Sequence, residues 1–242
     1  MISQLEKVKA IAVDVDGTIT DESGALHLEA IKALREVKEK TSVKIVLASG
    51  NAYPVLMGLA RYLGNVDLVI AENGGVVGFQ NNFKIIGRPE IGLKARKLVS
   101  SKLGYMLYES WQNKFRFVDF AFKLKRGYNW NEALEKVRQL IENEVPEATA
   151  AFSGVAIHVK DKVVNKGAGL IMAAKLLRLS PMDFLAIGDS DVDVEMMIKA
   201  GIGIAVANAS EKAIKVAKII TKNPRGQGFA EAVKMLINAK IK

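Results

Sequence analysis

The 242-residue sequence contains no cysteine and only two histidines. Without cysteine there can be no disulfide bond, thiolate metal ligand or cysteine nucleophile. The histidines, His27 and His158, adjoin none of the polar clusters described below, so we expect both to be structural, which disfavours catalysis by histidine. No apolar run approaches the roughly 18 residues that span a bilayer, and no N-terminal signal segment is present. These absences predict a cytoplasmic protein without a membrane partner.

Acidic residues are outnumbered, 26 against 35 basic ones, and the net charge of +9 is concentrated after residue 210. A basic C-terminal segment could bind nucleic acid. However, Lys212, Lys215 and Lys218 recur at helical spacing among apolar residues, which is typical of a solvated helix face. No aromatic residue is interleaved with these lysines to stack on bases. We therefore expect no nucleic-acid partner.

Apolar segments with strand and helix periods alternate at both ends of the chain. Strands and helices are expected in turn at residues 8–14, 28–40, 43–48, 55–63 and 67–71. The alternation resumes after residue 166, with a helix, a strand, a helix and a strand at residues 167–179, 184–187, 194–200 and 202–207. Further helices follow to the end of the chain. This order predicts an α/β fold with a doubly wound, parallel, Rossmann-like sheet.

The pattern changes between these two parts. A hairpin is expected at residues 74–87 and helices at 91–103 and 130–143, with strand-like runs at 116–124 and 150–159. The simplest interpretation is a core domain built from residues 1–83 and 161–242. Residues 84–160 would then be a small α+β domain inserted into it.

Polar clusters follow four strands of the predicted core. Asp14 and Asp16 close the first strand, and the other clusters are residues 49–51, 72–75 and 188–193. Because parallel strands point the same way, the clusters converge on one edge of the sheet, where open α/β sheets bind ligands. Charges at the end of a buried strand cost desolvation energy unless a metal or hydrogen bonds compensate. We interpret Asp14 and Asp16 as part of a site; a solvated Asp-Gly turn is the structural alternative.

Asp189, Asp191 and Asp193 mimic the first half of a calcium-binding EF-hand loop. That interpretation fails, because the positions that require glycine and glutamate are Val194 and Ala200. Asp189 would instead join Asp14 in offering hard oxygen ligands to Mg²⁺. Asp191 is better explained as a turn residue.

Lys166 opens the helix that follows the predicted insertion. A lysine near a helix N-terminus meets an unfavourable dipole, so a structural role is not especially expected there. Directed at the strand ends, it would neutralise a phosphate, while the Ser49 hydroxyl and the backbone around Gly50 hold other oxygens. A surface lysine is the alternative.

These residues resemble the motifs of the haloacid dehalogenase-like phosphatase superfamily. Residues 14–18 resemble its first motif, Ser49 its second, Lys166 its third and residues 188–193 its fourth. The insertion between the second and third motifs, together with residues 72–75, resembles the Cof-like subgroup with an α/β cap. Within it, the compact length and the Ser-Gly-Asn sequence resemble archaeal phosphoglycolate phosphatases. Two positions depart from many cap-bearing relatives: Val192 stands where they have Asn, and Asn51 where they have Arg.

The resemblance implies an enzyme, a phosphoric monoester hydrolase that forms an aspartyl-phosphate intermediate. Its substrate would be a small-molecule phosphate ester, with 2-phosphoglycolate the foremost candidate. Asp14 would attack phosphorus, and Asp16 would protonate the leaving oxygen and then activate water. The implied ligands of Mg²⁺ are Asp14, the backbone carbonyl of Asp16 and Asp189. Asp193 would bind the metal through water or orient its ligands. The implied substrate-binding residues are Ser49, Gly50, Asn51 and Lys166.

Other functions remain open at this point. The same scaffold serves sugar-phosphate phosphatases and phosphomutases. A different class would be a non-catalytic nucleic-acid-binding protein that uses the basic C-terminal segment, although the intact set of Asp14, Asp16, Ser49, Lys166 and Asp189 argues against it. We expect a monomer or a homodimer.

Overall fold

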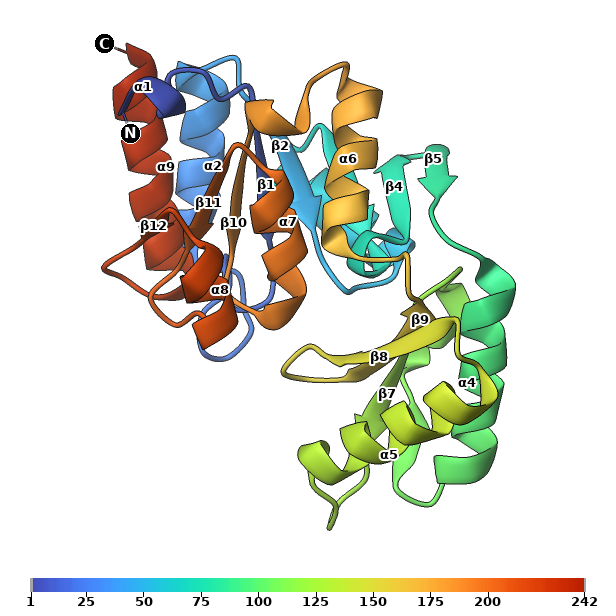
Figure 1. Ribbon diagram of the computed structural model, residues 1–242. Helices are drawn as coiled ribbons and strands as arrows, with labels where there is room; N and C mark the ends of the chain where they lie inside the picture. The colour runs from blue at the N-terminus through green and yellow to red at the C-terminus, as the bar shows by residue number, and fades with distance from the viewer. Residues whose placement is uncertain (1, 242) are drawn as a thin grey trace.

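The computed structural model describes residues 2–241, which form two separate sheets with their helices (Figure 1). The larger sheet has eight strands in the order β12-β11-β10-β1-β2-β3-β4-β5. Neighbours from β12 to β3 pair in parallel, and the hairpin β4–β5 extends the sheet in antiparallel fashion. The strands of this sheet are β1 (Ala10–Asp14), β2 (Lys44–Ala48), β3 (Leu68–Ala71), β4 (Val76–Phe79), β5 (Asn82–Ile85), β10 (Phe184–Gly188), β11 (Ile202–Ala205) and β12 (Ile219–Ile220).

Helices cover both faces of the larger sheet, because successive residues of a buried strand point to opposite sides. In β1, Ile11 and Val13 pack with α2, α3 and α9, whereas Ala10 and Ala12 pack with α6, α7 and α8. The short α1 lies against α9. The helices are α1 (Ile2–Leu5), α2 (Leu28–Lys40), α3 (Tyr53–Leu63), α6 (Lys166–Leu177), α7 (Val194–Lys199), α8 (Glu211–Val216) and α9 (Arg225–Ile241).

The smaller sheet is antiparallel, with the order β6-β7-β9-β8, and lies beside the larger one (Figure 1). Helices α4 and α5 pack on one of its faces around Phe120, Phe122 and Val159. The opposite face carries Lys123 and His158, which border the cavity described below. We call this unit the cap; its elements are α4 (Pro89–Leu103), β6 (Leu107–Glu109), β7 (Phe120–Leu124), α5 (Trp130–Glu144), β8 (Ala148–Phe152) and β9 (Ile157–Asp161).

Four 3₁₀ turns complete the described elements: η1 (Glu72–Gly74), η2 (Trp111–Phe115), η3 (Pro181–Asp183) and η4 (Asp191–Asp193). The fold class expected from the sequence is confirmed: a doubly wound, mainly parallel α/β sheet carries a separate α+β unit. The division into domains at residues 84 and 160 stays a prediction.

Two strand-like runs differ from the sequence prediction. Residues 150–159 are not one strand, because the chain reverses between β8 and β9, with Gly154 at a φ of 86° that favours glycine. The run at residues 116–124 is a strand only from Phe120. Before that point, the backbone N–H groups of residues 117–119 donate to Glu72 rather than to a neighbouring strand.

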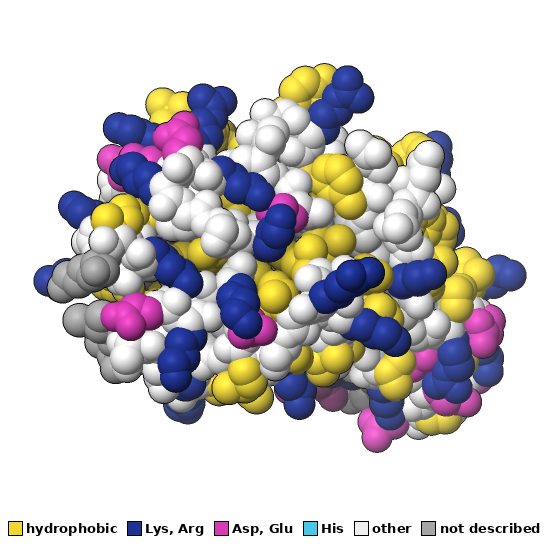
Figure 2. Space-filling view, turned by 90° about the horizontal axis from the view of Figure 1, so that it is seen from above, with side chains coloured by type: hydrophobic (Ala, Val, Ile, Leu, Met, Phe, Trp, Pro, Cys, Tyr) yellow, Lys and Arg dark blue, Asp and Glu magenta, His cyan; other side chains and the backbone are white. Residues whose placement is uncertain are grey.

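The surface bears out the expectation of a solvated basic helix. Lys212, Lys215 and Lys218 on and after α8 are exposed, and Lys212 pairs with Asp191 at 2.6 Å. Lysine and arginine side chains are spread over the face in Figure 2 rather than gathered in one patch. Within residues 2–241, no helix combines the length and apolar character needed to cross a membrane.

Candidate active site

Four strands of the larger sheet end at the same edge, as their parallel direction requires. The register pairs Asp14 at the end of β1 with Ala48 of β2, and the neighbouring strands β3 and β10 end at Ala71 and Gly188. The polar clusters that follow these strands therefore lie together, as the sequence indicated. Asp14, Ser49 and Asp189 are thus placed by strand ends rather than by long loops.

Lys166 joins two of the acidic residues. It is the first residue of α6, which is capped by the side chain of Asn165. Its Nζ lies 2.5 Å from Oδ1 of Asp14 and 2.6 Å from Oδ1 of Asp193. Burial alone would lower the pKa of Lys166, but the two carboxylates raise it above its ordinary value. Lys166 therefore remains a buried cation between two buried carboxylates.

Asp189 approaches the first cluster through a gap that only glycine leaves open. Gly17 has a φ of 93°, and a Cβ there would lie 2.3 Å from Oδ2 of Asp189. The hydroxyl of Thr18 donates to Oδ1 of Asp189 at 3.1 Å. The Gly-Thr pair after Asp16 thus serves to admit and orient Asp189.

Asp14, Asp189 and Asp193 fit a divalent cation. Each offers one carboxylate oxygen, and these atoms lie within 4.8 Å of one another. Burial, followed by the charge of Asp193, raises the pKa of Asp14 well above its ordinary value and that of Asp189 to about 6. Among the described residues, Oδ2 of Asp14 is buried and finds no hydrogen-bond partner. Crowded carboxylates and an orphaned acceptor are what a hard cation would stabilise.

Asp16 is exposed at the same edge and is held by the cluster after β2. Asn51 donates from Nδ2 to Oδ2 of Asp16 at 3.1 Å and to Oγ of Ser49 at 2.9 Å. The hydroxyl of the fully buried Ser49 also accepts the backbone N–H of Asn51. Gly50 lies between these two residues. The structure thus brings together all the residues that the sequence singled out, and their chemical roles stay predictions.

Asp191 lies outside this group. It is exposed, accepting from the hydroxyl of Ser210 at 2.7 Å and from Nζ of Lys212 at 2.6 Å. Asp191 therefore has surroundings separate from those of Asp189 and Asp193, in agreement with the interpretation of Asp191 as a turn residue.

A cavity of about 570 Å³ lies between the strand ends and the cap. Asp14, Asp16 and Lys166 line it from the core, and Lys123 and His158 from the cap. None of these cap residues is predicted from the sequence to lie at the site. The one signal available was strand periodicity, which places Lys123 on the face opposite Phe122 without showing what that face meets.

His158 adjoins none of the polar clusters in the sequence, but it contacts one of them in the fold. Its Nδ1 lies 2.8 Å from Oδ2 of Asp119, and Asn73, from the cluster after β3, donates to the same oxygen at 2.8 Å. Burial alone would raise the pKa of Asp119, but His158, Lys160 and Arg116 lower it. β9 brings His158 to the clusters, which no local pattern reveals. His27, in contrast, caps α2 by accepting the N–H of Glu29, a structural role.

Glu72 ties the core to the cap. Its Oε2 accepts the backbone N–H groups of Phe117, Val118 and Asp119 at 3.0, 2.9 and 3.2 Å. The side chain is fully buried, and this burial raises the pKa of Glu72 to about 7. Residues 117–119 lead directly into β7, so Glu72 fixes the start of a central cap strand.

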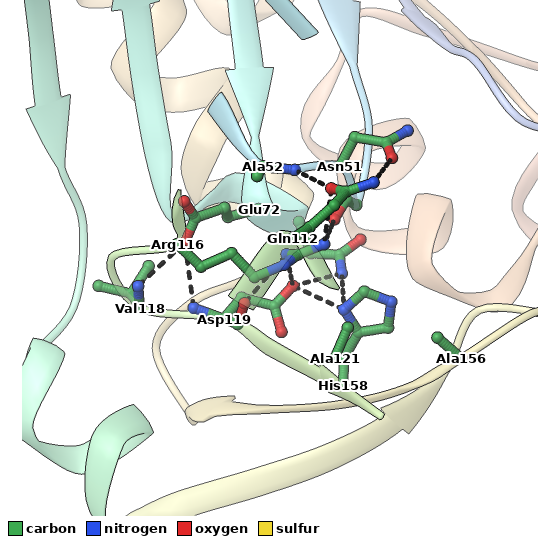
Figure 3. Close-up of polar contacts among 12 residues, drawn as sticks. Asn51, Ala52, Glu72, Gln112, Arg116, Val118, Asp119, Ala121, Ala156 and His158 are labelled. Atoms are coloured by element: carbon green, nitrogen blue, oxygen red, sulfur yellow. Dashed lines mark hydrogen bonds and ion pairs between the residues drawn. The ribbon is translucent and has the colours of Figure 1, made fainter. Parts of the chain in front are cut away.

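Two further cap residues contact the loop after β2 (Figure 3). Arg116 donates from Nη2 to the carbonyl of Gly50 at 2.7 Å. Gln112 donates from Nε2 to Oδ1 of Asn51 at 2.8 Å and accepts the backbone N–H of Ala52 at 2.7 Å. The cap therefore reaches the cluster that holds Asp16.

Comparisons with known proteins agree with this geometry. The model of the haloacid dehalogenase-like hydrolase family matches residues 11–103 and 108–233. A phosphoglycolate phosphatase of Archaeoglobus fulgidus is 38% identical over 95% of this chain and 97% of its own length. One of Methanococcoides burtonii is 37% identical over 96% and 97% of the two chains. A Thermoplasma acidophilum crystal structure superposes with a TM-score of 0.82 at 24% identity, covering 95% of this chain and 98% of that one.

The chain therefore belongs to the haloacid dehalogenase-like hydrolase family. Within that family it is a phosphatase, that is, an enzyme that hydrolyses phosphoric monoesters.

Proposed function

We propose that this phosphatase acts on a small phosphate monoester, foremost 2-phosphoglycolate, through an aspartyl-phosphate intermediate on Asp14. The observation that carries the proposal is the buried pair of Asp14 and Lys166 beside Asp16 at one cavity. Lys166 occupies Oδ1 of Asp14, whereas Oδ2 has no partner within residues 2–241. Asp14 thus has two oxygens in different surroundings, so one can attack phosphorus while the other faces the cation.

The reaction divides into two displacements. In the first, an oxygen of Asp14 bonds to phosphorus, the bond to the leaving oxygen breaks, and Asp16 gives that oxygen its proton. In the second, water attacks phosphorus, the bond to Asp14 breaks, and Asp16 takes the proton of the water. Lys166 neutralises charge on Asp14 and on the phosphoryl group, whose oxygens Ser49, Gly50 and Asn51 would also hold.

The cofactor would be Mg²⁺, which Asp14, Asp189 and the backbone carbonyl of Asp16 would hold. When bound, the ion supplies positive charge to the phosphoryl oxygens. Both oxygens of Asp193 already have donors: Lys166 on Oδ1, and the backbone N–H groups of Asp189 and Ser190 on Oδ2. This supports a role for Asp193 in orienting Asp189 rather than in direct ligation.

A second negative group on the substrate would suit the charges around the cavity. The cationic side chains that line it are Lys114, Arg116, Lys123 and Lys166. Lys123 donates to the carbonyl of Val155 at 2.8 Å, so its ammonium is held on the cap face. A short phosphorylated carboxylate would place its phosphate at Lys166 and its carboxylate toward the cap. The names of the archaeal relatives support the same substrate.

The test is a panel of phosphate esters assayed with Mg²⁺. Its central pair is 2-phosphoglycolate and 2-hydroxyethyl phosphate, which differ in the carboxylate, with hexose phosphates and nucleotides as larger members. We expect the highest kcat/KM for 2-phosphoglycolate and a selective loss of that advantage in Lys123→Ala. A preference for hexose phosphates would replace the proposed substrate with a sugar phosphate, and isomerised phosphate esters would indicate a phosphomutase.

Three further expectations belong to the proposal. The exposed lysines of α8 alternate with apolar positions, which supports a solvated face and no nucleic-acid partner. A salt-dependent shift of DNA or RNA in a gel would contradict it. Cytoplasmic location and a monomeric or homodimeric state complete the proposal, and sedimentation of the purified protein measures the latter.

A further inference from the structure

The cap residue Gln112 is part of a chain of hydrogen bonds that ends on Asp16 (Figure 3). The backbone N–H of Ala52 donates to Oε1 of Gln112 at 2.7 Å, and Nε2 of Gln112 donates to Oδ1 of Asn51 at 2.8 Å. Nδ2 of Asn51 then donates to Oδ2 of Asp16 at 3.1 Å. Both amides are half-buried, and all three contacts have ordinary hydrogen-bond lengths.

The direction of this chain is fixed at both ends. A backbone N–H can only donate, so Ala52 selects the oxygen of the Gln112 amide, and a carboxylate oxygen accepts, so Asp16 selects the nitrogen of Asn51. The partners therefore determine amide orientations that geometry alone leaves ambiguous. Arg116 adds a second donor to Oε1 of Gln112 at 3.3 Å, which reinforces the same orientation.

We infer that Gln112 is a positioning residue that couples docking of the cap to the orientation of Asp16. With the cap docked, Gln112 holds the amide of Asn51 so that its nitrogen faces Asp16. When the cap moves away, the Asn51 amide keeps its contact with Ser49 but loses Gln112, so the donor that orients the carboxylate of Asp16 is held less firmly. The inference rests on the proposed role of Asp16 as the acid for the leaving oxygen. Proton donation is then most effective when the cap encloses the substrate.

The coupling has a consequence that a merely structural contact lacks. In the first displacement, the bond between phosphorus and the leaving oxygen breaks while Asp16 supplies a proton to that oxygen. An alkyl oxygen, such as that of glycolate, is a poor leaving group and requires this proton. The p-nitrophenolate ion leaves without it. Misplacing Asp16 should therefore slow the release of alkyl oxygens and spare that of p-nitrophenolate.

The experiment compares kcat/KM for p-nitrophenyl phosphate with that for the alkyl phosphate that the wild type hydrolyses fastest. We expect Gln112→Ala to lower the alkyl value about tenfold or more and the p-nitrophenyl value by less than about threefold. Gln112→Glu should act in the same direction. It keeps the acceptor for Ala52 but presents an oxygen to Asn51, which turns the amide oxygen of Asn51 toward Asp16. Gln139→Ala makes the same chemical change on the exposed face of α5 and should alter neither value.

A double-mutant cycle completes the test. If Gln112 acts through Asn51, the alkyl-specific loss in the combined Gln112→Ala and Asn51→Ala variant should not exceed that of Asn51→Ala alone. Equal losses for both esters, or additive losses in the cycle, would overturn the inference. If Gln112→Ala does not melt cooperatively, the comparison of the two esters is made with Gln112→Glu, whose side chain has a similar size. A wild type that hydrolyses neither ester would refute the proposed function itself, a different result from equal losses.

Discussion

Lys166 donates from Nζ to Oδ1 of Asp14 across 2.5 Å, although 152 positions separate the two residues in the chain. The contact joins the end of β1 to the start of α6, the helix on which the chain returns to the larger sheet after the cap. Both side chains are almost completely buried, so the charge of Asp14 is stabilised mainly by Lys166, and the charge of Lys166 by Asp14 and Asp193. Folding of the core and assembly of the site are therefore linked.

Replacement of Lys166 should destabilise the metal-free protein. Lys166→Met leaves the carboxylates of Asp14 and Asp193 buried without their cation, which typically costs about 3–5 kcal/mol. Urea unfolding in chelator measures this loss. Lys175→Met, at an exposed position of the same helix, is the matched control and should stay within about 0.5 kcal/mol of the wild type. Equal stability of the two variants would mean that the buried pair contributes little.

The Mg²⁺ requirement of the enzyme should depend on Asp189 but not on Asp191. We expect chelation to abolish activity and Mg²⁺ to restore it. Asp189→Ala should raise the Mg²⁺ concentration for half-maximal activity at least about tenfold, because it removes an oxygen of the carboxylate cluster. Asp191→Ala, which removes exposed contacts with Ser210 and Lys212 outside the cluster, should have little effect. The rise in Tm on addition of Mg²⁺ should also be reduced more by Asp189→Ala than by Asp191→Ala, and this measurement needs no turnover. A larger effect of Asp191→Ala would mean that Asp191, and not Asp189, belongs to the metal site.

The buried carboxyl that joins core and cap should make stability depend on pH. Burial raises the pKa of Glu72 from an ordinary 4.5 to about 7, so the folded protein retains a proton that the unfolded chain releases. The stability gained is present below about pH 4.5 and is lost as the pH rises through 7. Over this range the free energy of unfolding should fall by up to about 3 kcal/mol more in the wild type than in Glu72→Gln. If urea unfolding gives the same pH dependence of the free energy of unfolding for the two proteins, Glu72 does not titrate in this way.

The sequence predicted that these polar residues meet at the strand ends because the determinants of that placement are local. Asp14 is the last residue of β1, Ser49 and Asp189 directly follow β2 and β10, and parallel pairing alone brings such residues together. Lys166 was recognisable for a similar reason, as the first residue of a helix. Helix α2 was predicted with its observed bounds because its apolar period and its flanking polar residues agree.

The contacts between cap and core could not be predicted in the same way. Glu72 accepts hydrogen bonds from residues 117–119, which follow it by 45 to 47 positions in the chain. Asn73 contacts His158, which follows it by 85 positions. These contacts depend on how the cap sits on the core, and no periodicity in either segment encodes that placement. The hairpin of β8 and β9 was missed because an apolar run hides a turn whose main signal is Gly154.

The most direct test of the account is to trap the phosphoryl group on the enzyme. Asp16→Ala should slow release of the intermediate while leaving Asp14 and the carboxylate cluster in place. After brief reaction with a ³²P-labelled phosphate ester and an acid quench, we expect label on the peptide that contains Asp14. The same experiment with Asp14→Asn should give neither label nor turnover. Label on another residue, such as Ser49, or a turnover rate of Asp14→Asn within tenfold of the wild type would contradict the account.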